Sequence, residues 1–79
     1  MKTPEVYAPV VRIKATGRHV LLVAWHRDKH GVWHGRVAWL ARQGVLWYGA
    51  DAWMPAKDLE RVEGEDYRAV PRTVDEPDF

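Results

Sequence analysis

The sequence predicts an all-β protein that folds as one small barrel, and three observations lead to this fold class. Residues 32–42 place apolar side chains on one face of an extended segment and mostly polar ones on the other, which is the period of a half-buried strand. Turn-forming residues separate the apolar segments at intervals of about 8–12 residues, the spacing typical of small sandwiches and barrels. No segment of useful length has the period of an amphipathic helix.

The length and composition limit the size of the core. A chain of 79 residues makes one domain at most, and it buries only about 60% of the surface that its unfolded form exposes. Without cysteine it has neither a disulfide nor a thiolate metal site. Its tryptophans are therefore core candidates first of all. We expect Trp39 and Trp53, in the most apolar strand segments, to be core residues, and leave Trp33 and Trp47, beside turns, open.

The first half of the chain predicts two strands and a loop. Residues 6–14 are rich in β-branched side chains, but Pro9 cannot donate to a ladder, so this segment should be an edge strand or a strand entry. Gly17 marks a tight turn. Residues 19–27 are almost continuously apolar, which is typical of a central strand covered on both faces or of one that crosses from one sheet to another. A hairpin loop of four residues, 28–31, should follow.

The second half begins with a hairpin. Its first strand is the alternating segment of residues 32–42, and Gln43-Gly44 turns the chain. Residues 45–53 return as the partner strand, in which Gly49 allows a bulge or a sharp bend. This hairpin is the clearest structural prediction in the sequence.

The remainder predicts the closing elements and the domain boundary. Residues 55–59 should form one helical turn, which proline begins without losing a needed N–H. A short strand at residues 60–63 and a last strand or strap at 67–70 complete the domain, which spans residues 1–70. Residues 71–79 hold two prolines and three acidic side chains, so we expect an acidic, flexible tail.

The order of these elements resembles that of an SH3-like barrel of the Tudor type. In that family a strand of pattern W-x-x-A/G-x-V leads into a hairpin partner, then into a W-V-P-x-x-D-L element and a closing strand. The matching segments are Trp33-His34-Gly35-Arg36-Val37, Val45-Leu46-Trp47-Tyr48 and Trp53-Met54-Pro55-Ala56-Lys57-Asp58-Leu59. The resemblance covers about residues 18–63. It implies a barrel of five strands, with one short 3-10 turn before the last strand.

The resemblance also implies a binding role. Members of the family use the mouth of the barrel to bind methylated or arginine-bearing peptides, nucleic acid or another protein. The counterparts of an aromatic mouth are Trp25, Trp47, Tyr48 and Asp51, although they do not align as a complete cage. A module that binds a protein or peptide at this mouth is therefore one hypothesis for the function.

Charge is distributed unevenly along the chain. Residues 1–57 hold nine basic and three acidic side chains, a net charge of +6, whereas residues 58–79 hold three basic and eight acidic ones, a net charge of −5. Such a split is typical of an anion-binding body with an acidic tail. The alternative is that the two halves simply neutralise one another for solubility.

Basic and aromatic side chains are interleaved in the predicted hairpin, as they are in grooves that bind single-stranded nucleic acid. We expect the cations to contact phosphates and the tryptophans to stack on bases. The residues are Arg27, Lys29, Trp33, Arg36, Arg42 and Trp47. The leading hypothesis is a small bacterial accessory or regulatory protein that contacts nucleic acid or the nucleic-acid machinery, with the acidic tail competing for this face. A further alternative is a structural homodimer through the edge strand at residues 6–14, so the chain is expected to be a monomer or a weak homodimer.

Catalysis, cofactors and metals are not expected. The chain has no cysteine and no serine, and no glycine-rich phosphate loop follows a strand. Its histidines, His19, His26, His30 and His34, lack a metal-ligand spacing, and a four-residue loop would place His26 and His34 diagonally. No apolar run approaches the ~20 residues of a membrane span. We therefore predict a cytoplasmic binding protein with no membrane partner.

Overall fold

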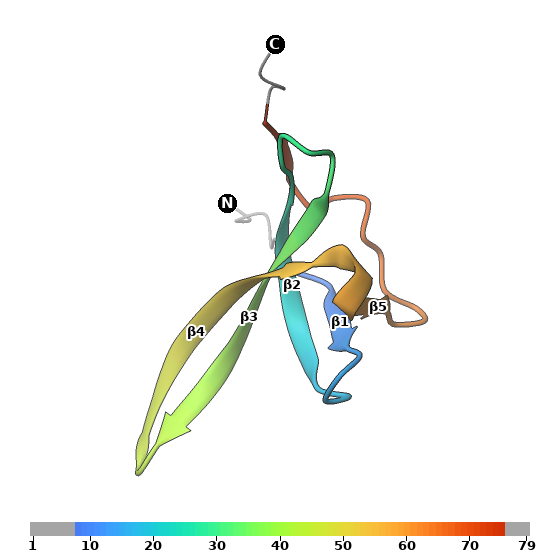
Figure 1. Cartoon of the computed structure of the whole chain (residues 1–79). Helices are drawn as coiled ribbons and strands as arrows, with labels where there is room; N and C mark the ends of the chain where they lie inside the picture. The colour runs from blue at the N-terminus through green and yellow to red at the C-terminus, as the bar shows by residue number, and fades with distance from the viewer. Residues whose placement is uncertain (1–7, 76–79) are drawn as a thin grey trace, which may run out of the picture.

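The structure is a computed structural model that describes residues 8–75 of the chain. It is all-β, as the sequence predicts, and contains no α-helix within the described part (Figure 1). The elements are β1 (Val10–Ile13), β2 (His19–Arg27), β3 (Trp33–Gln43), β4 (Leu46–Pro55), the 3-10 turn η1 (Ala56–Asp58), β5 (Leu59–Arg61) and β6 (Arg72–Val74). The predicted 3-10 turn is therefore present, directly before β5.

The strands form one sheet. Five antiparallel strands follow the order β4-β3-β2-β1-β5, and β6 lies along β2 outside this path. Within residues 8–75, the two terminal strands of the order do not pair with each other, so the sheet is not closed into the predicted barrel. Residues 8–75 also form six strands, where the sequence predicted five.

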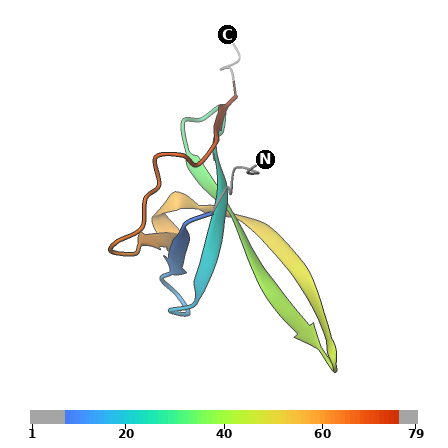
Figure 2. The same ribbon diagram turned by 180° about the vertical axis from the view of Figure 1, so that it is seen from behind.

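The hairpin of β3 and β4 projects from the rest of the sheet (Figures 1 and 2). β3 pairs with β2 only from Trp33 to Ala38, whereas it pairs with β4 as far as Gln43. The two strands therefore continue beyond the body as a ribbon of their own, and we call its residues 39–50 the arm. A two-residue turn closes the arm, where Gly44 at φ 61° has the conformation that the first central position of a type II′ turn requires.

The hydrophobic core lies on one face of the sheet, here called the inner face. The buried apolar residues are Val11, Val20, Leu22, Val37, Leu59 and Val70. Larger, partly buried side chains pack around them, namely Ile13, Trp25, Trp39, Met54 and Tyr67. Trp39, predicted as a core residue, is only partly buried and packs against the edge of the core, so its prediction holds in part. A core this small leaves much apolar surface of the chain outside it.

Residues 62–71, here called the strap, connect β5 to β6 and pack on the core. Val70 is buried, and Tyr67 packs against the core. The Tyr67 hydroxyl donates a hydrogen bond to the Val10 carbonyl and accepts one from the Val62 N–H at 2.8 Å. One side chain therefore ties the strap to the first strand.

The prediction of a flexible tail from residue 71 onward is wrong for residues 72–74. These residues form β6, which pairs in parallel with β2 from Trp25 to Arg27. The physical reason is that β1 covers only the first half of this edge of β2, so the second half would leave backbone groups unpaired. The Trp25 N–H donates to the Pro71 carbonyl, and the Asp75 N–H donates to the Arg27 carbonyl. The rest of the predicted tail, residues 76–79, lies outside the described residues.

Two further predictions about strands need correction. Residues 10–13 of the predicted edge strand form β1, which is paired on both sides, with β2 and with β5. This strand therefore offers no open edge to a second copy, while residues 6–7 lie outside the described part. The bulge is not at Gly49, which pairs regularly with Leu40, but at Val23, where the register between β2 and β3 shifts.

Candidate functional site

The arm carries the four most exposed large apolar side chains of residues 8–75, together with Tyr48. Leu40 is 66% exposed, Val45 87%, Leu46 69%, Trp47 63% and Tyr48 50%. Because side chains alternate along a strand, these residues cover both faces of the ribbon as well as its tip. An isolated two-stranded ribbon is marginally stable in water, and monomers rarely expose contiguous apolar surface of this kind.

The two faces of the arm can be assigned from the pairing register. Trp47 lies opposite Arg42, and with Leu40 these side chains point to the outer face, away from the core. Leu46 and Tyr48 point to the opposite face, the continuation of the inner face beyond the core. Residues 38–50 contain a single charged side chain, that of Arg42. The arm is therefore apolar on both faces and almost uncharged.

Arginine side chains stack on three tryptophans of the β3–β4 hairpin. The stacked pairs are Arg18 over Trp39 at 5.7 Å, Arg36 over Trp53 at 5.7 Å and Arg42 over Trp47 at 5.8 Å. Arg36 also forms a salt bridge of 2.7 Å with Asp51 across the two strands. Arg42 donates from Nε to the Gly44 carbonyl at 2.7 Å. Two of the predicted phosphate-binding cations are thus engaged within the hairpin.

Trp53 is 49% exposed, so the prediction that it belongs to the core is wrong. It lies directly opposite Arg36, which fixes its side chain on the outer face. There it also meets the ring of His26 edge-on, with 6.0 Å between centroids. The apolar context of the strand did not reveal this, because the face depends on the register with β3.

The six residues predicted to bind nucleic acid do not form one cluster. Trp33, like Arg27 and Lys29, lies in or beside the loop between β2 and β3, whereas Arg42 and Trp47 lie beside the turn between β3 and β4. Arg42 lies nine positions beyond Trp33 along the extended strand, a span of about 30 Å. Arg36 lies between them and is neutralised by its salt bridge.

The four residues of the predicted aromatic mouth are also not brought together. Trp25 packs against the core, while Trp47 and Tyr48 lie on opposite faces of the arm. Asp51 forms its salt bridge with Arg36 on the outer face. These side chains therefore line no common cage in the structure.

A different aromatic cluster lies at the body, and the sequence did not predict it. Trp25 and Trp33 share the inner face and meet Tyr67 of the strap around a hollow of about 300 Å³. Arg61 and Arg72 also line this hollow, and the guanidinium of Arg61 lies 5.7 Å from the Tyr67 ring centre. The period of β2 and β3 could have placed the two tryptophans on one face of the sheet, but no signal in the sequence placed the strap beside them.

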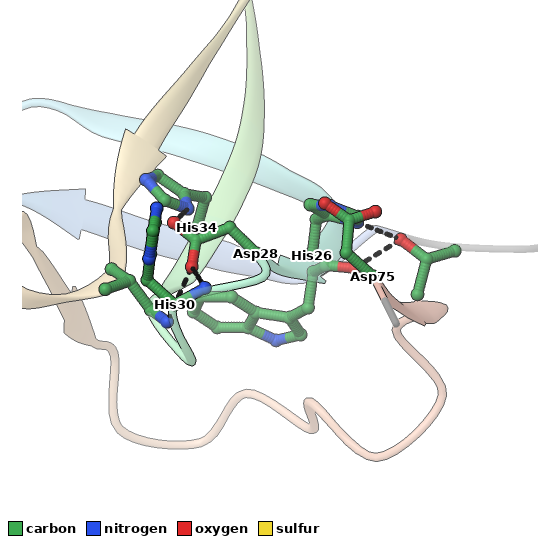
Figure 3. Close-up of polar contacts among 8 residues, drawn as sticks. His26, Asp28, His30, His34 and Asp75 are labelled. Atoms are coloured by element: carbon green, nitrogen blue, oxygen red, sulfur yellow. Dashed lines mark hydrogen bonds and ion pairs between the residues drawn. The ribbon is translucent and has the colours of Figure 1, made fainter. Parts of the chain in front are cut away.

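The pairing of β2 with β3 differs from the predicted register in the region of the histidines, which Figure 3 shows in close-up. The loop between β2 and β3 has five residues, 28–32, because Arg27 pairs with Trp33. His26 and His34 are consequently direct cross-strand neighbours and not diagonal ones. The close-up in Figure 3 shows each beside its own carboxylate: His26 Nε2 is 3.0 Å from Asp75, and His34 Nδ1 is 3.9 Å from Asp28.

The polar contacts of the histidine region hold the loop and β6 in place. Asp28 accepts hydrogen bonds from the N–H groups of Val32 at 3.0 Å and His30 at 2.9 Å, and the bond from Val32 is the main reason that the pKa of Asp28 is lowered. His26 Nδ1 lies 2.7 Å from the Thr73 hydroxyl of β6. Within residues 8–75, no three His, Cys, Asp or Glu side chains are grouped so that they could hold a metal ion.

The function of the chain has to be inferred from its structure, because comparison with known proteins identifies no relative. Within residues 8–75, no helix is long and apolar enough to cross a membrane. The two surfaces that stand out are the apolar arm and the aromatic hollow beside the strap. No family model, curated protein or solved structure matches the chain.

Proposed function

We propose that the chain is a non-catalytic, cytoplasmic module that binds protein, and that the arm is its contact surface. The observation that carries this proposal is the exposure of five large apolar side chains on a ribbon that projects from the body. Covering these side chains removes apolar surface from water, which is the main driving force of protein association. Exposed tryptophan and tyrosine are also the residues that most often dominate binding energy at protein interfaces.

Charge supports a protein partner over nucleic acid at the arm. Affinity for nucleic acid comes largely from cations that neutralise phosphates. The arm has one cation, Arg42, which stacks on Trp47 and donates to a backbone carbonyl. Interface cores, in contrast, are depleted of charge and enriched in aromatic residues, which is the composition of the arm.

The test is a comparison of partners retained by the wild type and by an arm variant. We expect Trp47→Ala to weaken binding of a protein partner by 30-fold or so, the effect of removing an interface hot spot of about 2 kcal/mol. The partner would be recovered by affinity capture after nuclease treatment, and its affinity then measured with purified proteins by calorimetry.

The matched control is Val32→Ala. Val32 is also an exposed apolar residue, at 46%, but it lies in the loop between β2 and β3, at the opposite end of β3 from the arm. Its replacement should leave the affinity unchanged. Equal binding by wild type and Trp47→Ala, or capture that nuclease abolishes, would contradict a protein-binding arm.

The fold proposal is an open relative of the SH3-like barrel of the Tudor type. The strand order β4-β3-β2-β1-β5 and the 3-10 turn before β5 support this assignment. Two features depart from the five-stranded barrel that the sequence predicts, namely the elongated β3–β4 hairpin and the added strand β6. The strand β6 lies beyond residues 18–63, on which the resemblance rests, whereas the elongated hairpin lies within them.

A second candidate function is contact with nucleic acid at the hollow beside the strap. The supporting observation is that Trp33 and Tyr67 line the same hollow as Arg61 and Arg72. Within residues 8–75 neither arginine forms a salt bridge, and Arg61 stacks on Tyr67, which leaves Arg72 as the main candidate for a phosphate contact. Aromatic rings stack on bases, and an arginine without a salt bridge can contact a phosphate. This hypothesis retains nucleic acid as the partner, as the sequence predicts, but places its binding site at the hollow and not at the hairpin.

Titration with a short single-stranded DNA tests this second candidate. We expect amide shifts at Trp33, Tyr67 and Arg72 that weaken between 50 and 200 mM salt, since phosphate contacts release counterions. Shifts confined to the arm, or none at low salt, would rule out the hollow. Any test of the acidic tail should end the chain after Asp75, because removal of residues 71–79 would also delete β6.

A further inference from the structure

We infer that the partner of the arm is a second copy of this chain, joined through the outer edge of β4. This inference rests on the proposed function, because it names the protein that covers the arm. The strand order ends at β4, so its ten residues present an edge that no other strand of residues 8–75 covers. The edge at β1 that the sequence offered for a dimer is filled, which leaves β4 as the longest free edge.

The edge of β4 lacks the devices that prevent pairing. Soluble proteins protect edge strands with lysine, proline, bulges or short length. From Leu46 to Met54, β4 has no lysine, no proline and no bulge, and Asp51 is its only charged residue. It pairs regularly with β3 along its whole length. Such an edge is suited to antiparallel pairing with an identical strand.

The sequence of β4 is self-complementary in size. Its first residues, Leu46-Trp47-Tyr48, are large, whereas Gly49, Ala50 and Ala52 further along are small. We consider an antiparallel pairing of two β4 strands, related by a two-fold axis at Gly49. In this pairing each large side chain of one copy lies beside a smaller residue of the second copy. Leu46 then faces Ala52 of the second copy, and Tyr48 faces its Ala50. A two-fold arrangement repeats each of these contacts twice.

Charge is also complementary in this register. Trp47 faces Asp51 of the second copy, and both lie on the outer face, since both have odd positions in β4. The Arg42 guanidinium that stacks on Trp47 therefore approaches the carboxylate of the second copy. Arg36 already holds the Oδ2 atom of Asp51, so the carboxylate is fixed on this face in advance.

The area fits a weak dimer. Trp47 and Tyr48 are 63% and 50% exposed in the single chain, so each of the four aromatic side chains can add only about half of the roughly 150–250 Å² of a full burial. With the paired strands the interface is at most on the order of 1,000 Å². This is near the lower limit for a specific interface. We therefore expect dissociation at about micromolar concentration, with monomer and dimer both present in dilute solution.

Sedimentation velocity of the full chain from 5 to 500 µM, at fixed salt, tests the inference. The wild type should shift from monomer to dimer with rising concentration. Gly49→Lys places two like charges opposite each other at the two-fold axis and should weaken the dimer at least tenfold. Gln43→Lys adds the same charge to the arm on β3, away from the pairing edge, and should leave the dimer intact.

A cysteine crosslink supplies the second readout, because the chain has no cysteine of its own. Gly49→Cys should crosslink efficiently with a short bis-maleimide, since the two copies meet at this residue. Val45→Cys should not, since two-fold pairing carries the two tips to opposite ends of the interface. Thermal unfolding of each variant verifies that the body is folded.

The outcomes separate this inference from the proposed function. A chain that stays monomeric at 500 µM, but binds another protein through Trp47, would overturn the second copy and leave the protein-binding arm. A dimer that persists equally in Gly49→Lys and Gln43→Lys would overturn pairing at β4. Loss of the dimer in Gly49→Lys alone, with crosslinking at position 49, supports the inference.

Discussion

Gly35→Ala should destabilise the protein by about 1–3 kcal/mol, the cost of overpacking a core. A Cβ at Gly35 would lie 2.7 Å from Cδ1 of Leu59 and 3.0 Å from Cδ1 of Leu22. Both leucines are buried, so neither can swing into solvent to make room. The ring of Trp25 closes the third side at 3.2 Å. Urea and thermal unfolding measure the loss, which should lower the melting temperature by about 4–8 °C for each kcal/mol.

Gly49→Ala is the matched control for Gly35→Ala. Gly49 lies on the same hairpin, but its added Cβ would meet no atom within 4 Å. Its replacement should therefore change the stability of the monomer, measured in dilute solution, by less than about 0.5 kcal/mol, as for ordinary surface substitutions. A similar loss in both variants would mean that Gly35 is needed for its backbone and not for the close approach of Leu59.

Tyr67→Phe should cost about 1–2 kcal/mol, because one hydroxyl serves two backbone groups. Its removal leaves the Val10 carbonyl without its donor and the Val62 N–H without its acceptor. Unsatisfied backbone groups in partly buried positions carry most of this cost. Hydrogen exchange should show faster exchange at Val62 and along the strap, together with a lower urea midpoint.

Tyr48→Phe provides the comparison for the hydroxyl at Tyr67. Tyr48 is half-exposed on the arm, where water reaches its hydroxyl group. We expect no measurable loss of stability from this variant. If both tyrosine variants unfold at the wild-type midpoint, the strap is held by the burial of Val70 and not by Tyr67.

The sequence predicted the elements of the fold better than their extent. The alternation of residues 32–42 and the turn at Gly44 correctly located the hairpin, and the proline at residue 55 located the 3-10 turn. Alternation cannot show where a strand leaves its neighbour, because paired and unpaired segments have the same period. The divergence of β3 from β2 after Ala38 was therefore not predictable, and the arm follows from it.

The candidate site was less predictable for a related reason. The face on which Trp53 lies depends on its pairing with Arg36, and the register of His26 with His34 depends on one loop residue. Shifting a pairing by one position moves every side chain to the other face. The strand β6 was hidden because residues 71–79 have the composition of a flexible tail. The strand forms because β1 leaves the second half of the β2 edge without a pairing partner, and residues 72–74 supply one.

The sheet topology has a consequence for the order in which the chain folds. The hairpin grows from Gln43 and Leu46, which are three residues apart, and hairpins of this kind form in about 1–10 µs. Closing β1 on β5 joins Val11 to Arg61, fifty residues away, so it waits on a large loss of chain entropy. The element that forms earliest therefore carries the most exposed apolar surface. Two nascent chains can meet through their hairpins before either has completed its core.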